Sequence, residues 1–245
     1  MYIPFSELLT KKSRRYTLEN ELFFQLDSKL ASMFLQLETL IGEEKMSILF
    51  PREYHLKGAY LIKQGEHVEN FYFLEKDGVA RLLLEHEQVN LTAGFTLPFE
   101  FVGCVYRTHF DQTYSYSVQL LKDCYVRVFS LKKVHVLAEE YPIVSQILGI
   151  VRSCALQRSF DESNELRFLD AKCRYYWLMK SQPSLVKLVP SKYIAEYIGV
   201  SPECLSRIRA SAKSLPPFKF KSSTELILFQ NSPIVTGKQI GRAHV

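Results

Sequence analysis

The stretch from Leu188 to Ala210 constrains the fold of this chain more than any other. Apolar residues recur at helical spacing over its first half, and Gly199 follows where a helix end needs a left-handed residue. Ser201 can cap a second helix, and Pro202 suits its first position because no backbone N–H is needed there. We therefore predict a helix-turn-helix, whose second helix can enter the major groove of DNA. Its buried stripe would consist of Ile194, Ala195, Ile198, Leu205 and Ile208.

A plain helical hairpin inside a protein core is the alternative, because an Ala-x-x-x-Gly spacing alone is common. The whole set is more specific, since a cap at Ser201 and two arginines, Arg207 and Arg209, accompany the spacing. The combination favours DNA binding.

The distribution of charge agrees with this interpretation. The chain has 245 residues and a net charge of +5. Residues 171–245 hold twelve Lys or Arg and three Glu, a net charge of +9, so residues 1–170 carry −4. An acidic body with a basic C-terminal part is typical of a sensor joined to a phosphate-facing module, although a charged face in water is the alternative.

Several other classes of protein are disfavoured. Apolar runs end before 18 residues and no signal-peptide pattern opens the chain, so we expect a cytoplasmic protein without a membrane partner. The five cysteines are scattered without a C-x-x-C pair, so we expect no zinc module, disulfide framework or cofactor. A cupin-like metalloenzyme is the enzymatic alternative, but His67-Val68-Glu69 lacks the second His of that metal motif. We expect no catalytic site.

The spacing of apolar residues changes twice along residues 1–166. Residues 1–40 read as an N-terminal extension or helix, and short aromatic and β-branched segments from 54 to 129 predict a barrel or jelly roll. Lys76-Asp77-Gly78 is a turn signal that predicts a hairpin of 71–74 with 79–84. A helical period then covers residues 136–166.

That helix carries an apolar seam with 3-4-3 spacing. Such a seam can pair with a second copy in a coiled coil, or it can pack on its own domain. Helix-turn-helix proteins usually read two half-sites, so we expect a homodimer. The seam residues are Val144, Ile147, Val151 and Cys154.

The C-terminal part would begin with a helix over 171–180 capped by Asp170. Segments 218–221 and 226–229 are suited to the two strands of a wing. Residues 231–245 have no period, and we expect a disordered tail or an addition from cloning.

The order of these elements resembles the Crp/Fnr family of bacterial transcription regulators. The resemblance implies an α+β fold: an N-terminal β-roll (double-stranded jelly roll) sensor at 41–135, a long dimerisation helix at 136–166 and a winged helix-turn-helix at 167–230. The segments that carry it are Lys57-Gly58, Leu61-Ile62, Gly65-Glu66, Phe71–Gly78, Phe101-Val102-Gly103, Tyr116-Ser117-Val118, Tyr193–Gly199 and Leu205-Ser206-Arg207-Ile208.

The resemblance implies a two-fold-symmetric operator in double-stranded DNA, with RNA polymerase as a further partner. Arg207 would read guanine and Glu203 would accept from cytosine, while Lys192 and Arg209 would meet phosphates. Pro202 stands where catabolite-activator members have an arginine, so the base preference should differ. The residues expected at the DNA are Lys192, Ser201, Pro202, Glu203, Ser206, Arg207 and Arg209.

The sensor departs from the family pattern. Members that bind cyclic nucleotides have a Glu after the cassette glycine and an Arg before the next strand, but here Cys104 follows Gly103 and the Arg position falls on Ser115. We therefore expect no gating by cyclic AMP, and an unknown small-molecule effector or none. The candidate effector pocket comprises Cys104, Tyr114, Ser115 and Tyr116. A dimeric ligand-sensing β-roll without DNA binding is the alternative function.

Overall fold

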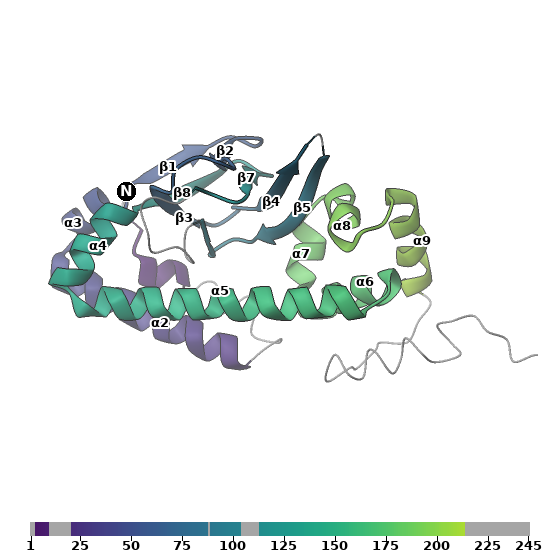
Figure 1. Cartoon of the computed structure of the whole chain (residues 1–245). Coiled ribbons are helices and arrows are strands. Elements are labelled where there is room, and N and C mark those ends of the chain that lie inside the picture. Colours follow the sequence, from purple (N-terminus) through teal and green to yellow (C-terminus); the bar gives the residue numbers. More distant parts are fainter. Residues whose placement is uncertain (1–2, 10–20, 88, 104–112, 214–245) are drawn as a thin grey trace, which may run out of the picture. The chain divides into compact units, whose positions relative to one another are not determined.

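The computed structural model describes residues 3–9, 21–87, 89–103 and 113–213 (Figure 1). The predictions for Cys104, for the wing at 218–229 and for the tail at 231–245 lie outside these residues. The chain divides into two compact units, one running to Arg158 and the other from Ser159 onward. We describe each unit separately.

The described strands of the first unit form two four-stranded antiparallel sheets. The strand order is β1-β8-β3-β6 in one sheet and β2-β7-β4-β5 in the other. The prediction of an all-β roll in this part of the chain is confirmed. The strands are β1 (Arg52–His55), β2 (Tyr60–Ile62), β3 (Asn70–Leu74), β4 (Ala80–His86), β5 (Val89–Thr96), β6 (Phe101–Gly103), β7 (Ser117–Leu120) and β8 (Cys124–Ser130).

The predicted hairpin of 71–74 with 79–84 is wrong. β3 pairs with β6 and β8, whereas β4 pairs with β5 and β7, so the segment between β3 and β4 passes from one sheet to the other. The turn itself exists, because Gly78 N donates to Glu75 O at 2.9 Å. A Cβ on Gly78 would lie 2.6 Å from the Leu74 Cβ. The glycine is therefore required by close packing rather than by hairpin geometry.

The inner strands β8 and β3 of the β1-β8-β3-β6 sheet have buried side chains on both faces, whereas the edge strand β1 is largely exposed. Alternate residues point to opposite faces of a strand. On β8, Val126 belongs to the core between the two sheets, while Phe129 belongs to a second core under the helices. The helices that contribute to this second core are α2 (Glu21–Ile41), α3 (Glu43–Leu49), α4 (Leu131–Glu140) and α5 (Pro142–Phe168).

An ion pair links α5 to the β-roll. Both terminal nitrogens of Arg158 donate to the Glu100 carboxylate, at 2.7 and 2.8 Å. Glu100 is buried and also accepts from the Leu97 backbone N–H at 3.0 Å. A bidentate pair of this kind fixes direction as well as distance.

The N-terminal segment 3–9 is part of the second core. Phe5 is fully buried, and its ring stacks on Phe34 with centroids 4.9 Å apart. Its backbone N–H and the Ser6 hydroxyl both donate to the Glu38 carboxylate on α2. Phe5, Leu8 and Leu9 have helical spacing and are buried, but so short a run does not tell from the sequence what the segment packs against.

Arg127 on β8 connects the sheet to segment 3–9. Its side chain is 1% exposed and its Nε donates to Glu75 at 3.0 Å. It also donates to the Ile3 carbonyl, and its guanidinium lies 4.6 Å from the Phe5 ring centroid. Glu75 is paired with Arg52 as well, at 2.9 Å. The buried charges therefore have partners on several sides, as buried ions require.

The described helices wholly within the second unit are short. Asp170 caps the first of them by accepting from Cys173 N at 2.8 Å, as predicted. Cys173, Tyr175 and Leu178 on that helix are buried. The helices are α6 (Ala171–Ser181), α7 (Pro183–Leu188), α8 (Ser191–Ile198) and α9 (Pro202–Lys213).

Replacement of Phe5 tests whether the N-terminal segment is part of the fold. Phe5→Ala removes a fully buried ring, and we expect the free energy of unfolding to fall by about 3–5 kcal/mol. Urea unfolding followed by circular dichroism measures this change. Leu35→Ala is the control: Leu35 is 55% exposed, and we expect a change within about 0.5 kcal/mol. Equally small changes for both variants would contradict the packing of segment 3–9.

Candidate nucleic-acid interface

Helices α8 and α9 meet at the predicted tight turn. Gly199 has φ 73° and ψ 39°, the left-handed conformation that glycine adopts without strain. Its N–H donates to Glu196 O at 3.1 Å, and Val200 N donates to Ala195 O at 2.9 Å. These bonds end α8 and turn the chain sharply into α9. The predicted helix-turn-helix is present.

The start of α9 is capped as the sequence predicted. Cys204 N donates to the Ser201 hydroxyl at 3.2 Å. The predicted apolar stripe is buried between the helices: Ile194, Ala195, Ile198, Leu205 and Ile208 are all at most 8% exposed. Since these side chains face inward, the polar residues Glu203, Ser206 and Arg207 of α9 face outward.

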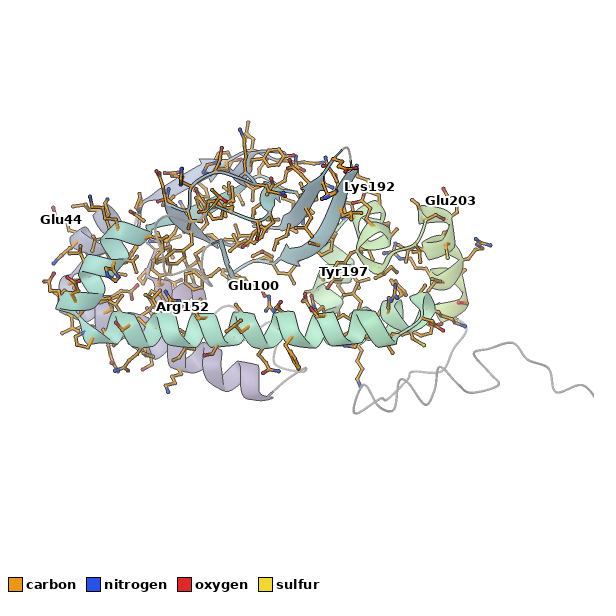
Figure 2. All side chains as sticks on the ribbon, viewed as in Figure 1. Glu44, Glu100, Arg152, Lys192, Tyr197 and Glu203 are labelled. Carbon is orange, nitrogen blue, oxygen red and sulfur yellow. The ribbon has the colours of Figure 1, made fainter. Side chains whose placement is uncertain are left out.

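Six of the seven residues predicted to meet DNA are exposed. Figure 2 labels Lys192 on α8 and Glu203 on α9. The exposed residues are Lys192, Ser201, Pro202, Glu203, Ser206 and Arg207. Arg209 is half-buried and engaged with other helices of the unit. Among the residues predicted to meet DNA, the exposed set therefore ends at Arg207.

The start of α9 carries a stabilised negative charge. A hydrogen bond from its own backbone N–H lowers the pKa of Glu203, with further contributions from the Ser201 hydroxyl and from Arg207. Glu203 is therefore a carboxylate at neutral pH. It can act only as a hydrogen-bond acceptor, four residues before the cation of Arg207 on the same helix.

Another arginine, Arg174, stabilises the turn between α8 and α9. Arg174 on α6 donates through Nη1 to Ile198 O, the last residue of α8, at 3.0 Å. Its Nε donates to Leu169 O at 2.8 Å. Arg174 was not among the residues predicted from the sequence, because a long-range cap from a helix 24 residues away leaves no local pattern.

The tyrosines of the candidate effector pocket are occupied by the protein's own backbone. Tyr114 is buried and its hydroxyl donates to Asn70 O, while the Tyr116 hydroxyl donates to Gly103 O at 2.9 Å. Both side chains belong to or pack against the core between the sheets. Ser115, between them, is exposed. Tyr114 and Tyr116 therefore lie in or against the core between the two sheets, whereas Ser115 lies on the surface.

Two buried cysteine thiols are not suited to reaction as thiolates. Burial raises the pKa of Cys124 to about 11 and that of Cys173 to about 12, and neighbouring carboxylates add to both shifts. Among the described residues, no group of three His, Cys, Asp or Glu side chains could hold a metal ion. Nor is any described helix long and apolar enough to span a bilayer.

Comparison with solved structures identifies the fold. FixK2 from Bradyrhizobium japonicum has a TM-score of 0.58 at 16% identity, over 72% of this chain and 95% of that one. CLP from Xanthomonas campestris, described as a c-di-GMP responsive global regulator, has a TM-score of 0.55 at 17% identity, over 73% and 94%. A protein from Eubacterium rectale, described as a regulator of the Crp/Fnr family, has a TM-score of 0.56 at 12% identity, over 78% and 94%. This chain has the Crp/Fnr fold. No protein-family model and no curated protein sequence matches it.

Within this Crp/Fnr fold, the seam predicted for dimerisation lies inside the chain's own core. Val144, Ile147 and Val151 are 4%, 4% and 7% exposed, and they pack with the phenylalanines of the second core. Cys154 is half-buried. This is the alternative in which the helix packs on its own domain. A 3-4-3 apolar pattern indicates that one face of a helix is buried, but it does not indicate whether that face packs on its own domain or on a second copy.

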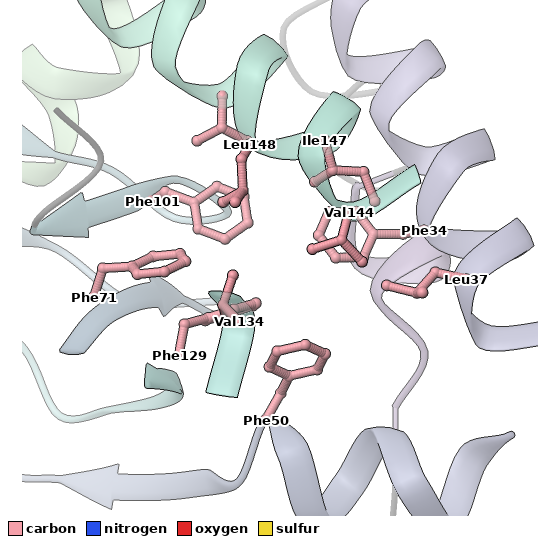
Figure 3. A pocket seen from close by; sticks show the side chains of 11 residues that line it. Phe34, Leu37, Phe50, Phe71, Phe101, Phe129, Val134, Val144, Ile147 and Leu148 are labelled. Atoms are coloured by element: carbon pink, nitrogen blue, oxygen red, sulfur yellow. The ribbon is translucent and has the colours of Figure 1, made fainter. Parts of the chain in front are cut away.

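The seam residues border a small void rather than a ligand pocket. Figure 3 shows the void, which measures about 20 Å³. That volume is close to what one water molecule needs, but a buried water also needs polar partners. Every lining side chain is apolar: Phe34, Leu37, Phe50, Phe71, Phe101, Phe129, Val134, Val144, Ile147, Leu148 and Val151. The void is therefore a dry packing gap, too small for a nucleotide.

Proposed function

We propose that this protein is a transcriptional regulator that binds double-stranded DNA with α9 in the major groove. The observation that carries the proposal is the exposed polar face of α9, presented on a helix-turn-helix whose turn, cap and buried stripe are all formed. A capped, rigid second helix of this kind is the element that reads base edges in such proteins.

The exposed residues divide into base readers and phosphate contacts. Arg207 can donate two hydrogen bonds to the O6 and N7 atoms of guanine, and ionised Glu203 can accept from a cytosine amino group. Lys192, exposed on α8, is suited to a phosphate, which positions the protein without reading sequence. Ser201 already caps α9, so its main role is to hold the helix start.

Binding as a homodimer to a two-fold-symmetric operator is part of the proposal, because helix-turn-helix proteins usually bind two half-sites. The core already covers Val144, Ile147 and Val151, so we place the dimer seam on the opposite side of α5. There the exposed residues follow alternating three- and four-residue steps, the spacing of a two-helix seam. They are Gln146, Gly149, Ser153 and Leu156.

The proposal does not include gating by cyclic AMP. A cyclic phosphate carries a full negative charge, and binding it requires a charge-assisted partner. Ser115 is neutral and exposed, and the hydroxyls of Tyr114 and Tyr116 already donate to backbone carbonyls. These features support an effector of another class, or a regulator that needs none.

Arg207→Ala tests the base-reading role. We expect this variant to lose about 1–3 kcal/mol of affinity for the selected operator while random DNA is bound as before. Fluorescence anisotropy on a site found by in vitro selection measures both affinities. Lys192→Ala is the matched control, expected to weaken both DNAs alike and to reduce the salt dependence by about one ion. Equal losses on both DNAs for Arg207→Ala would assign Arg207 to a phosphate.

Two substitutions on opposite sides of α5 test the dimer seam. Leu156 is 58% exposed, so Leu156→Asp should leave the fold intact and shift the protein to monomers in sedimentation. Ile147→Asp instead puts a charge into the core and should unfold the protein, because an unpaired buried charge is very costly. A folded Leu156→Asp dimer would place the interface elsewhere.

Calorimetry tests the exclusion of cyclic nucleotides. Titration with cyclic AMP and cyclic GMP should give no saturable heat at millimolar ligand, since a neutral hydroxyl contributes only about 0.5–1.5 kcal/mol per hydrogen bond. Arg107, four residues after Gly103 in the sequence, is the arginine nearest the family's phosphate cassette. Micromolar binding that Arg107→Ala abolishes would contradict this expectation and assign the phosphate-binding cation to Arg107.

A further inference from the structure

Arg209 joins three helices of the second unit. Its Nε donates to the Tyr175 hydroxyl on α6 at 3.1 Å, and its Nη1 donates to the Ser191 hydroxyl at the first residue of α8. Its guanidinium carbon lies 5.5 Å from the centre of the Tyr175 ring. Arg209 itself belongs to α9. A side chain predicted to reach a phosphate is thus directed into its own domain.

These contacts fix the orientation of α9, which burial of the apolar stripe alone does not fix. Burial of Leu205 and Ile208 holds α9 against its neighbours, but the hydrophobic effect has no direction and tolerates rotation of the helix. A guanidinium has donors in a fixed plane, so two bonds to different helices constrain the orientation of the third. The orientation of α9 decides where Glu203 and Arg207 point.

We propose that Arg209 is a positioning residue: it fixes the orientation of α9 through Tyr175 and Ser191 and makes no phosphate contact. The inference rests on the proposed DNA-binding function and concerns how specificity arises in it. Arg209 acts on the operator only through α9. Removal of its hydrogen bonds should therefore lower sequence discrimination and leave the number of neutralised phosphates unchanged.

Two variants separate positioning from a phosphate contact. Arg209→Lys keeps the positive charge but loses the planar pair of donors, so a phosphate contact would survive and a positioning role would not. Tyr175→Phe removes one hydroxyl from a side chain that is only 4% exposed and cannot itself touch DNA. Any effect of Tyr175→Phe on operator binding must therefore pass through its neighbours.

The measurement is anisotropy titration of operator and random duplexes over a range of salt concentrations. For Arg209→Lys we expect roughly tenfold weaker operator binding, the scale of hydrogen bonds to a charged group, with random DNA and the salt slope unchanged. Tyr175→Phe should change operator binding in the same direction. The double variant should lose less than the two single losses combined, because both variants break one contact.

Fluorescence of Trp177, the single tryptophan of the chain, reports whether each variant keeps the second unit folded. Tyr175→Phe is the milder change and keeps the test decisive if Arg209→Lys fails to fold. The inference is overturned if Arg209→Lys binds the operator like the parent while Arg209→Ala lowers the salt slope by about one. Equal losses on operator and random DNA would overturn it as well. A parent protein that retains no duplex DNA would refute the proposed function itself, and this inference with it.

Discussion

A guanidinium group that leaves water must find acceptors for its donors, and this requirement shapes both units of the protein. An unpartnered buried cation is among the most costly features a fold can contain. In the first unit, Arg127 meets the requirement with Glu75 and the Ile3 carbonyl. In the second, Arg174 and Arg209 meet it with a helix end and two hydroxyls. In each case the acceptors come from segments distant in sequence, so partnering the charge fixes how those segments pack.

Hydrophobic burial on one side only explains why the two sides of α5 differ. One side is covered by segment 3–9, α2 and the phenylalanines of the β-roll, and Arg158 adds a directional link to Glu100. With that side used for the core of the first unit, the proposed dimer seam falls on the opposite side. Gly149 and Ser153 on that side are small, so two helices could approach closely there. Leu156 would provide the apolar contact.

Features that depend on local chemistry could be predicted from the sequence, and features that depend on distant partners could not. Gly199 and Ser201 specify a turn and a cap through their own backbone chemistry, so the residues alone locate the helix-turn-helix. The turn before Gly78 is equally recognisable, but which strands it joins depends on pairing partners far along the chain. Arg209 was assigned to a phosphate because its position on α9 gives no sign of Tyr175, 34 residues away. In segment 3–9 the apolar residues have helical spacing over less than two turns, and the contacts that hold the segment involve the distant Arg127 and Glu38.

The charges on α9 suggest how specificity would exceed general attraction to DNA. An ionised carboxylate on Glu203 is favourable at the helix start, yet it repels phosphates and offsets the field of Arg207 four residues later. With Arg209 turned inward, the exposed face of α9 up to Arg207 has little net positive charge. Such a helix gains little from the phosphate backbone alone, which supplies nearly all non-specific affinity. In the proposed function its contribution would therefore come from base edges that match both a donor pair and an acceptor, which makes the orientation of α9 more important than its charge.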